Sequence, residues 1–251
     1  MTDPFSEKLQ AWQQYTRTPW ARIRYAVVAE ILRREASTLG AGLRVLDVGG
    51  GDGMDALPLA RAGHDVTIVD PSESWLAEAQ RRARAEATTI STIRGGLDDL
   101  PEGEWDLVLC HFVLRYRPAD GGDIPALARR VRRGGRLSVM DVNPAGRVLR
   151  TVVSDGPAAA MAELQADTLA VHTFNTEVRK VEADRISDEA RAAGLVQVGH
   201  YGNRIANDLL VDDLPKHDES YFDDLLALEL ELSGREPFNR IGFAWQLVFA
   251  R

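Results

Sequence analysis

Residues 45–53, with the sequence VLDVGGGDG, constrain the fold of this chain more than any other segment. The apolar residues over 43–48 predict a buried strand, and the glycines that follow predict a sharp turn into a helix. Because glycine has no Cβ atom, a ligand can approach the backbone closely at such a turn. The segment therefore predicts a strand–turn–helix unit that binds a ligand at the turn.

Beyond residue 40, short apolar runs alternate with segments of helical periodicity, which is typical of βαβ units. The pattern predicts helices between the strands, at 54–63, 72–87 and 124–135. Strands are expected at 43–48, 65–70, 89–94, 105–113, 136–142, 196–205 and 242–251. The sequence thus predicts an α/β fold with a doubly wound, mostly parallel sheet.

This alternation breaks after residue 143. Residues 143–156 and 158–172 look helical, 172–185 look irregular, and Ser187 is a candidate N-cap for the next helix. We expect one domain with four parts. They are an N-terminal helical cap (1–40), a ligand-binding core (41–143), a helical insertion or lid (144–185) and the remainder of the sheet (186–251).

Composition narrows the function classes. The 251 residues carry a net charge of −8, which does not suit general electrostatic binding of nucleic acid. The single cysteine, Cys110, excludes an internal disulfide, and the five histidines lack the spacing of a metal site. Neither a signal peptide nor a membrane-spanning run is evident. We expect a cytoplasmic monomer or homodimer that binds neither membrane nor metal.

Two ligand classes use a glycine turn of this kind. Gly51, Gly53 and Ala56 satisfy the G-x-G-x-x-G/A pattern of dinucleotide-binding folds. However, the carboxylates of Asp47 and Asp52 lie beside the turn, which disfavours a diphosphate and suits a cationic ligand. S-adenosylmethionine (SAM) has a sulfonium, an ammonium and no phosphate. The residues favour SAM, and leave open a dinucleotide or a glycine turn without a ligand.

The motifs at 44–53, 62–72, 111–116 and 132–140 resemble those of class I SAM-dependent methyltransferases. The later blocks NRIANDLL (203–210), ALELELSGREPF (227–238) and IGFAWQLVFAR (241–251) are less generic. They resemble the bacterial tRNA 5-carboxymethoxyuridine methyltransferases, which methylate a carboxymethoxy group on a wobble uridine. The similarity covers nearly the whole chain. It implies a Rossmann-like class I methyltransferase fold, with a seven-stranded sheet and a helical insertion before strand six.

The resemblance also implies a set of cofactor contacts. They fall on Arg24, Gly49, Gly50, Asp70, Gly96, Leu97 and His111. Arg24 can pair with the methionine carboxylate of SAM, and Asp70 can accept hydrogen bonds from the ribose. We expect Leu97 and Trp75 to enclose the adenine, with Asp98 or a backbone group at its edge. The structural alternatives are a solvated Arg24, an N-cap role for Asp70 and core packing for Trp75. The full set expected around SAM is Arg24, Asp47, Gly49, Gly50, Gly51, Asp70, Trp75, Gly96, Leu97 and His111.

On the acceptor side of the site, the residues expected depend on the chemical class of the acceptor. A carboxylate acceptor is ionised at pH 7, so it needs a cation to hold it and no base. Arg204 is the candidate clamp, and its alternative is a salt bridge to the acidic helix at 218–231. His111 is either a general base for a hydroxyl acceptor or a residue that only positions SAM. The other residues expected to line this mouth are Asn207, Asp208, Tyr201, Arg115 and Tyr116.

The charge pattern guides the expected acceptor. The tRNA-modifying family has a lysine-rich insertion before strand six, whereas residues 141–200 hold nine acidic and six basic residues here. The clustered cations Arg129, Arg130, Arg132 and Arg133 are expected on the helix before strand five, far from the mouth. We therefore expect methyl transfer to an oxygen, of a carboxylate or hydroxyl, on a small molecule such as a natural-product intermediate, with S-adenosylhomocysteine (SAH) as the product.

Three alternatives remain open at the level of sequence. One is methyl esterification of 5-carboxymethoxyuridine at the wobble position, with tRNA as the partner. The second is an NAD-dependent oxidoreductase that uses the pattern at Gly51, Gly53 and Ala56. The third is a module that binds SAM or SAH without turnover, because no residue is unmistakably catalytic.

Overall fold

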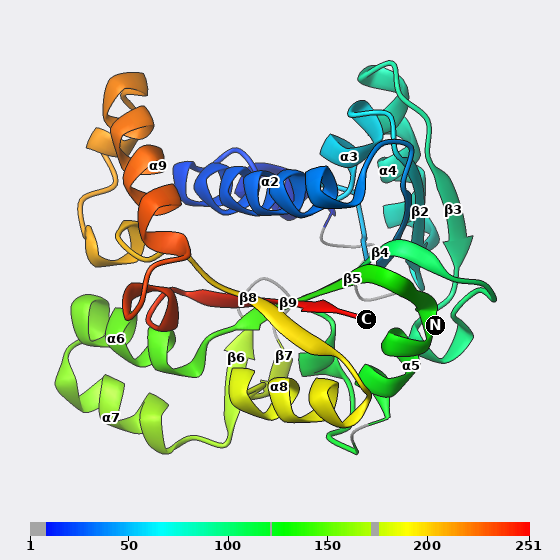
Figure 1. Cartoon of the computed structure of the whole chain (residues 1–251). Helices are drawn as coiled ribbons and strands as arrows, with labels where there is room; N and C mark the ends of the chain where they lie inside the picture. The colour runs from blue at the N-terminus through cyan, green and yellow to red at the C-terminus, as the bar shows by residue number, and fades with distance from the viewer. Residues whose placement is uncertain (1–8, 121, 172–175) are drawn as a thin grey trace.

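The structure, a computed structural model, describes residues 9–120, 122–171 and 176–251. Its centre is a seven-stranded sheet in the order β3-β2-β1-β4-β5-β9-β8 (Figure 1). In this sheet β9 runs antiparallel to both of its neighbours, β5 and β8. The predicted doubly wound, mostly parallel α/β fold is confirmed. The strands are β1 (Arg44–Val48), β2 (Asp65–Asp70), β3 (Ser91–Arg94), β4 (Trp105–His111), β5 (Val131–Val142), β8 (Val196–Asn203) and β9 (Ala244–Ala250).

Helices cover both faces of the sheet, as Figure 1 shows. On one face α2 (Pro19–Leu39), α3 (Leu57–Arg61) and α4 (Glu73–Ala85) pack against Val45, Val66 and Leu107. On the other face α5 (Asp123–Arg130) and α8 (Ala183–Ala192) pack against Leu46 and Val108. Because side chains alternate along a strand, covering both faces requires apolar residues at nearly every position. This is why the strands read as continuous apolar runs.

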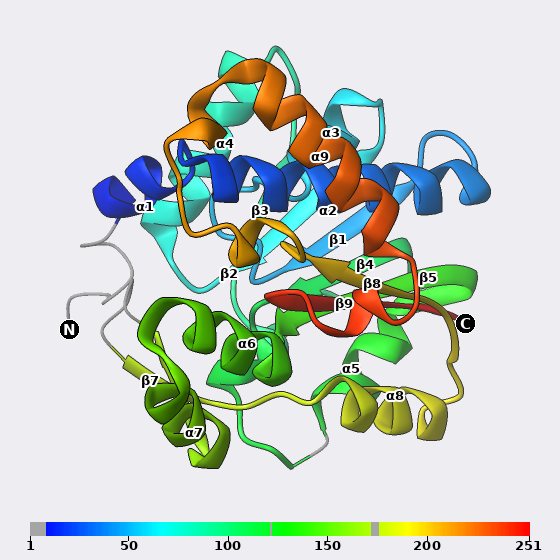
Figure 2. The same ribbon diagram turned by 90° about the vertical axis from the view of Figure 1, so that its left-hand side faces the viewer.

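Two further helices flank this core. Helix α9 (Glu219–Ser233) packs against α2 through Phe222 and Leu225, while α1 (Leu9–Tyr15) precedes α2 (Figure 2). Among the described residues, no helix is long and apolar enough to cross a membrane.

The order of the strands places a ligand site. β1 lies between β2 and β4, and chain connections run outward from it in both directions. The carboxyl end of a strand at such a switch point opens into a crevice, because the helices that follow leave on opposite faces. The glycine turn after Val48 lies at this position.

The insertion differs from expectation. It begins with the helices α6 (Pro144–Asp155) and α7 (Pro157–Gln165), but it continues with β6 (Thr168–Val171) and β7 (Thr176–Arg179), which pair as an antiparallel ribbon. The predicted helix over 158–172 was therefore wrong beyond Gln165, and residues 176–179 are not irregular. The ribbon forms because Leu169 and Val178 pack together against Val142, a long-range contact that local periodicity does not reveal. Residues 172–175 lie outside the described part.

Two boundaries also differ from the prediction. Helix α8 begins at Ala183, so Ser187 lies inside it and donates its hydroxyl to the carbonyl of Ala183 instead of capping the helix. Strand β5 begins at Val131, so Arg132 and Arg133 belong to the strand and not to the preceding helix.

The start of α6 is packed closely against the loop before β9, which gives a test of the fold. A Cβ atom added at Gly146 would lie 2.0 Å from the carbonyl oxygen of Gly242. We expect Gly146→Ala to lower the free energy of unfolding by about 1–3 kcal/mol, because the backbone must move to make room. The measurement is urea denaturation followed by circular dichroism. Gly96→Ala is the control, since an added Cβ there meets no atom within 4 Å. Equal midpoints for the two variants would contradict the close packing.

Candidate functional site

The glycine turn leaves no space for side chains. A Cβ atom at Gly49 would lie 2.3 Å from Cγ2 of Val113, and one at Gly50 would lie 2.4 Å from Oδ2 of Asp47. Gly49, Gly51 and Gly53 also have positive φ angles of 70°, 53° and 79°, which favour glycine. The backbone of the turn therefore packs directly against Val113, which follows β4, and against the side chain of Asp47.

Asp47 carries a buried carboxylate with unused hydrogen-bonding capacity. It is 2% exposed, and its Oδ2 has no hydrogen-bond partner among the described residues. Burial, together with the nearby carboxylates of Asp55 and Asp70, raises the pKa of Asp47 well above its usual range. A buried acceptor without a partner requires an explanation, and a bound ammonium or N–H donor supplies one.

Asp70 joins the turn to the next helix. Its Oδ2 accepts from the backbone N–H of Gly51 at 3.0 Å, and its Oδ1 accepts from that of Ser72 at 2.9 Å. Ser72 is the N-cap residue of α4, yet its side chain makes no capping bond. Asp70 thus stands at the end of β2 and fixes the turn and the start of α4 in one arrangement.

Helix α1 covers this turn. Trp12 Nε1 donates to Oδ2 of Asp52 at 3.1 Å, and the ring of Trp12 meets that of Trp75 edge-on at 5.5 Å. Burial raises the pKa of Asp52 to about 6, although Arg82 and Trp12 oppose this shift. Trp75 is buried, and its ring lies 3.4 Å from where a Cβ of Gly51 would stand. The site at the turn is thereby enclosed on the side of α1 by aromatic rings.

The expected adenine side is built from the segment after β3. Leu97 is buried at the start of a 3₁₀ turn (Leu97–Asp99), and Gly96 before it has open space around its Cα. Asp98, a candidate for the adenine edge, instead forms a two-point ion pair with Arg117 at 2.7 Å. Leu97 and Trp75 remain the candidates to enclose a planar base.

A chain of buried polar side chains runs from α2 across the sheet. Arg24 forms a two-point ion pair with Asp55 at 2.6 and 2.7 Å, and Oδ2 of Asp55 lies 2.9 Å from Nδ1 of His111. Nε2 of His111 lies 2.9 Å from the hydroxyl of Ser138, which also accepts from Gln246 at 2.9 Å. Burial alone would raise the pKa of Asp55, but Arg24 and His111 lower it to about 2.

This chain fixes which ring nitrogen of His111 donates to Asp55. An ionised Asp55 can only accept, so Nδ1 of His111 carries the proton. The Gln246 amide donates to Ser138, which leaves the Ser138 hydroxyl free to donate to Nε2 of His111. Both ring nitrogens are thus occupied within the protein. This arrangement favours a positioning role over a general-base role.

Three buried arginines gather beside this chain, around two phenyl rings. The guanidinium groups of Arg24 and Arg115 lie 4.9 and 4.5 Å from the ring centroid of Phe112, and that of Arg204 lies 4.2 Å from the centroid of Phe243. Phe112 and Phe243 pack against the same small cluster at the base of the β6–β7 ribbon. The structure therefore brings together Arg24, Arg115 and Arg204.

Arg204 is held by its own neighbour. It is 4% exposed, has a φ of 56°, and binds Asp208 through Nε and Nη2, both at 2.8 Å. The acidic helix contributes differently, because Glu229 of α9 accepts from the backbone N–H groups of Ile205 and Asn207. The salt bridge of Arg204 is therefore local and does not reach the 218–231 helix.

The other expected acceptor residues divide into two groups. Arg115 and the half-exposed Tyr116 lie in the 3₁₀ turn after β4 (Leu114–Tyr116), and Asn207 donates through its side chain to Asp208. Tyr201 instead donates to Glu35 near the end of α2, away from Arg24 at the beginning of that helix. The structure thus does not bring Tyr201 to the ring cluster.

Several residues of the site were not anticipated. Asp55 lies two residues after the motif at 44–53, and Phe112 lies inside the motif at 111–116. Their positions relative to these motifs could therefore have indicated them. Ser138 and Phe243 lie inside the recognised blocks at 132–140 and 241–251, and Asp141 directly follows the first of these. The sequence does not show that their side chains reach the site.

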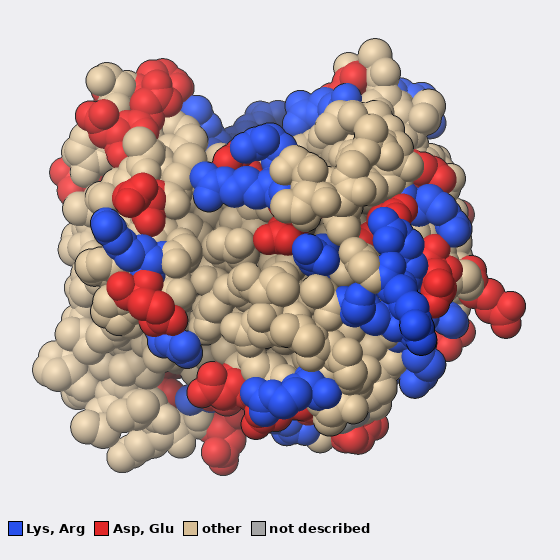
Figure 3. Space-filling model, in the orientation of Figure 1, with Lys and Arg blue, Asp and Glu red and all other residues tan. Residues whose placement is uncertain are grey.

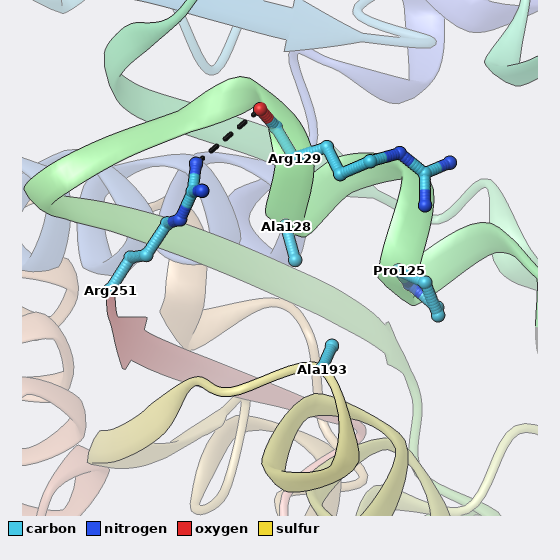
Figure 4. A pocket seen from close by; sticks show the side chains of 5 residues that line it. All are labelled: Pro125, Ala128, Arg129, Ala193 and Arg251. Atoms are coloured by element: carbon cyan, nitrogen blue, oxygen red, sulfur yellow. Dashed lines mark hydrogen bonds between the residues drawn. The ribbon is translucent and has the colours of Figure 1, made fainter.

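Charged regions and a shallow pocket lie on other parts of the surface. Figure 3 shows acidic side chains over the region of α9, and a band of basic side chains on the side of α5 and the C-terminus. A shallow pocket lies in that second region, where the side chains of Arg129 and Arg251 border Pro125, Ala128 and Ala193 (Figure 4). It lies near the start of β5, at the opposite end of the strands from the glycine turn, and contains no pair of acidic and nucleophilic groups.

Comparison with known proteins agrees with the geometry. Residues 45–135 match a family model described as a methyltransferase domain. The chain is 28% identical over 237 residues to the tRNA 5-carboxymethoxyuridine methyltransferase of Escherichia coli K12. This alignment covers 90% of this chain and 87% of that protein. It is 35% identical over 152 residues to an uncharacterised protein of Mycobacterium tuberculosis, covering 57% of this chain and 55% of that one. The match thus spans about half the length of the mycobacterial relative.

Solved structures show the same fold. The magnesium protoporphyrin IX methyltransferase of Synechocystis PCC 6803, solved with bound SAH, aligns with a TM-score of 0.62 at 19% identity, over 93% of this chain and 85% of that one. Residues 45–135 are therefore a methyltransferase domain, and the chain has the fold of the class I SAM-dependent methyltransferases. The predicted resemblance to SAM-dependent methyltransferases and the predicted Rossmann-like fold are confirmed.

Asp55 provides a test of the buried chain. We expect Asp55→Asn to lower the free energy of unfolding at pH 7 by about 3–5 kcal/mol, because Arg24 is left buried without its countercharge. In the wild type this carboxylate stabilises the fold above its ordinary pKa of 3.8, and the contribution is lost as the pH falls toward about 2. Urea denaturation at pH 7 and pH 3 measures both effects.

The matched control is Asp65→Asn, since Asp65 is exposed at the start of β2. We expect that variant to resemble the wild type at both pH values. If Asp55→Asn lost no more stability than this control, the ion pair with Arg24 would not contribute as the geometry indicates.

Proposed function

We propose that this protein, whose fold is that of the class I methyltransferases, binds SAM at the glycine turn and transfers its methyl group to an oxygen of a small molecule. The observation that carries the cofactor is the set of acceptors at the turn. Asp47 offers an unpartnered buried oxygen to an ammonium, and Asp70 stands at the strand end where a ribose diol fits.

The same carboxylates disfavour a dinucleotide. Asp47, Asp52, Asp55 and Asp70 all lie at or near the turn, and their charges oppose a pyrophosphate. The helix that follows, α3, spans only Leu57–Arg61, and so offers a weak dipole for phosphate binding. SAM, which is cationic at sulfur, is the better match.

Methyl transfer from SAM to an ionised oxygen does not require a general base. SAM already activates its methyl carbon, so alignment of the acceptor oxygen supplies most of the catalysis. His111 is occupied by Asp55 and Ser138. An acceptor oxygen that is ionised at neutral pH, such as a carboxylate, suits this site better than a hydroxyl that must lose a proton.

The second candidate is methyl esterification of the wobble uridine of tRNA. It is favoured by the 28% identity to the Escherichia coli enzyme over 90% of the chain. The charge distribution disfavours it. Residues 211–236 hold nine carboxylates against Lys216 and Arg235, and the basic band lies away from the glycine turn.

Incubation of the protein with SAM and separate pools of acceptors distinguishes these candidate functions. The quantity measured is the formation of SAH. We expect SAH to form with a panel of small carboxylic acids and phenols in the absence of RNA. Formation only with bulk tRNA would establish the second candidate instead. Tight SAM binding without SAH from any pool would indicate a non-catalytic binding module. Thermal stabilisation by NAD and not by SAM would indicate the oxidoreductase.

Asp70 tests the cofactor site directly. We expect Asp70→Ala to weaken SAM binding roughly ten- to hundredfold in calorimetric titration, because buried hydrogen bonds to the ribose are lost. Asp65→Ala, an exposed carboxylate at the other end of the same strand, should bind SAM like the wild type. An unchanged affinity in Asp70→Ala would mean that the ribose lies elsewhere.

A further inference from the structure

Arg115 has hydrogen-bonding capacity that the protein does not use. It is 8% exposed, and its Nε lies 2.9 Å from Oδ1 of Asp141. Its Nε and Nη2 are both buried without a hydrogen-bond partner among the described residues, so the contact with Asp141 is an ion pair that lacks hydrogen-bond geometry. Burying a donor without an acceptor is costly, so a native structure retains one only where something compensates.

The other two arginines of the cluster are differently placed. Arg204 gives Nε and Nη2 to Asp208, and Arg24 gives both terminal nitrogens to Asp55. In Arg115 the nitrogen nearest to the carboxylate is Nε, and no hydrogen bond joins either terminal nitrogen to a described residue. The terminal end of a guanidinium matches the two oxygens of a carboxylate.

The charges around Arg115 leave room for an anion. Asp141 is 1% exposed, and its Oδ1 lies 2.9 Å from Nε of Arg115. Burial raises the pKa of Asp141, although the charges of Arg115 and Arg179 oppose this shift. Arg117, beside them, is paired with Asp98 and Asp123. Asp98 is largely exposed, so water screens its charge, and Arg185 is paired with Glu189. Of the two buried carboxylates in this region, Asp123 pairs with Arg117, and Asp141 is the one that contacts Arg115.

The position of Arg115 relative to the glycine turn is also suitable. Val113 packs against Gly49, so the segment that carries Arg115 lies directly on the turn. Phe112, whose φ of 61° is rare for a residue with a side chain, places its ring within 4.9 Å of Arg24 and 4.5 Å of Arg115. Arg24 is the residue expected at the methionine end of the cofactor, so Phe112 lies between that end and Arg115.

We propose that Arg115, and not Arg204, anchors the acceptor, by binding an acidic group of it through the two terminal guanidinium nitrogens, with Phe112 against the body of the acceptor. Arg115 is then a specificity-determining residue, and the acceptor is a carboxylic acid. The inference rests on the proposed function, since it takes the glycine turn as the cofactor site. Arg204, satisfied by Asp208, holds the loop at 203–210 in place.

Binding of 4-fluorobenzoate to the full-length protein saturated with SAH, followed by fluorine NMR, tests this proposal. We expect the wild type to bind 4-fluorobenzoate and to bind the neutral 4-fluorobenzamide at least about tenfold more weakly. Arg115→Lys keeps the charge opposite Asp141 but has one nitrogen in place of the fork. It should bind 4-fluorobenzoate about tenfold more weakly than the wild type and bind SAH equally well.

Two further variants complete the design. Arg117→Gln removes a neighbouring arginine whose carboxylate partners are Asp98 and Asp123, and it should bind 4-fluorobenzoate like the wild type. The double variant Arg115→Met, Asp141→Asn removes both buried charges together. It should keep its SAH affinity and lose the binding of 4-fluorobenzoate, which separates the lost anchor from any instability caused by an unpaired Asp141.

The possible failures are distinguishable. If the wild type does not bind SAH, the proposed function fails. If SAH binds but 4-fluorobenzoate does not, or if 4-fluorobenzamide binds equally well, the anchor is wrong while the cofactor site stands. Equal binding of 4-fluorobenzoate by Arg115→Lys and the wild type, or its loss in Arg204→Lys instead, would also overturn the assignment.

Discussion

The carboxylate of Asp55 is the interaction on which the rest of the site depends. It binds Arg24 from α2 and His111 from the end of β4, so one side chain after the glycine turn ties together two elements that the chain order separates. Through His111 the link continues to Ser138 in β5 and Gln246 in β9. Because burying any one of these charges alone is costly, the elements can adopt their native positions only together.

The fold followed from the sequence where local pattern and burial agree. Strands such as 105–111 are buried at nearly every position, so nearly every residue is apolar and the run is easily recognised. Prediction failed where a contact between distant segments decides the structure. Thr168–Val171 has no strand partner nearby except Thr176–Arg179, and helical periodicity through 158–165 extends into it. Similarly, Ser187 has the composition of an N-cap, but the helix begins four residues earlier at Ala183.

For the site, the sequence could indicate which residues stand near the glycine turn but not which of them are already satisfied. Arg24, Arg115 and Arg204 read alike as cations in or near motifs. Their partners Asp55 and Asp141 come from other elements. Only the folded arrangement shows that Asp208 forms two hydrogen bonds with Arg204, whereas the side chain of Arg115 forms no hydrogen bond with Asp141. The capacity left over on each guanidinium is a property of the packing and not of the motif.

The same pairing bears on the size of the acceptor. A polyanion such as tRNA gains affinity from many accessible cations and releases counterions as it binds. In this protein the cations beside the turn are buried and mostly neutralised by a carboxylate each, and α9 adds acidic charge nearby. Such a site gives a long anion little attraction at a distance, yet it can hold one acidic group that enters and meets Arg115. The net charge of −8 and the unsatisfied Nη2 of Arg115 therefore favour the same class of acceptor, a small acid.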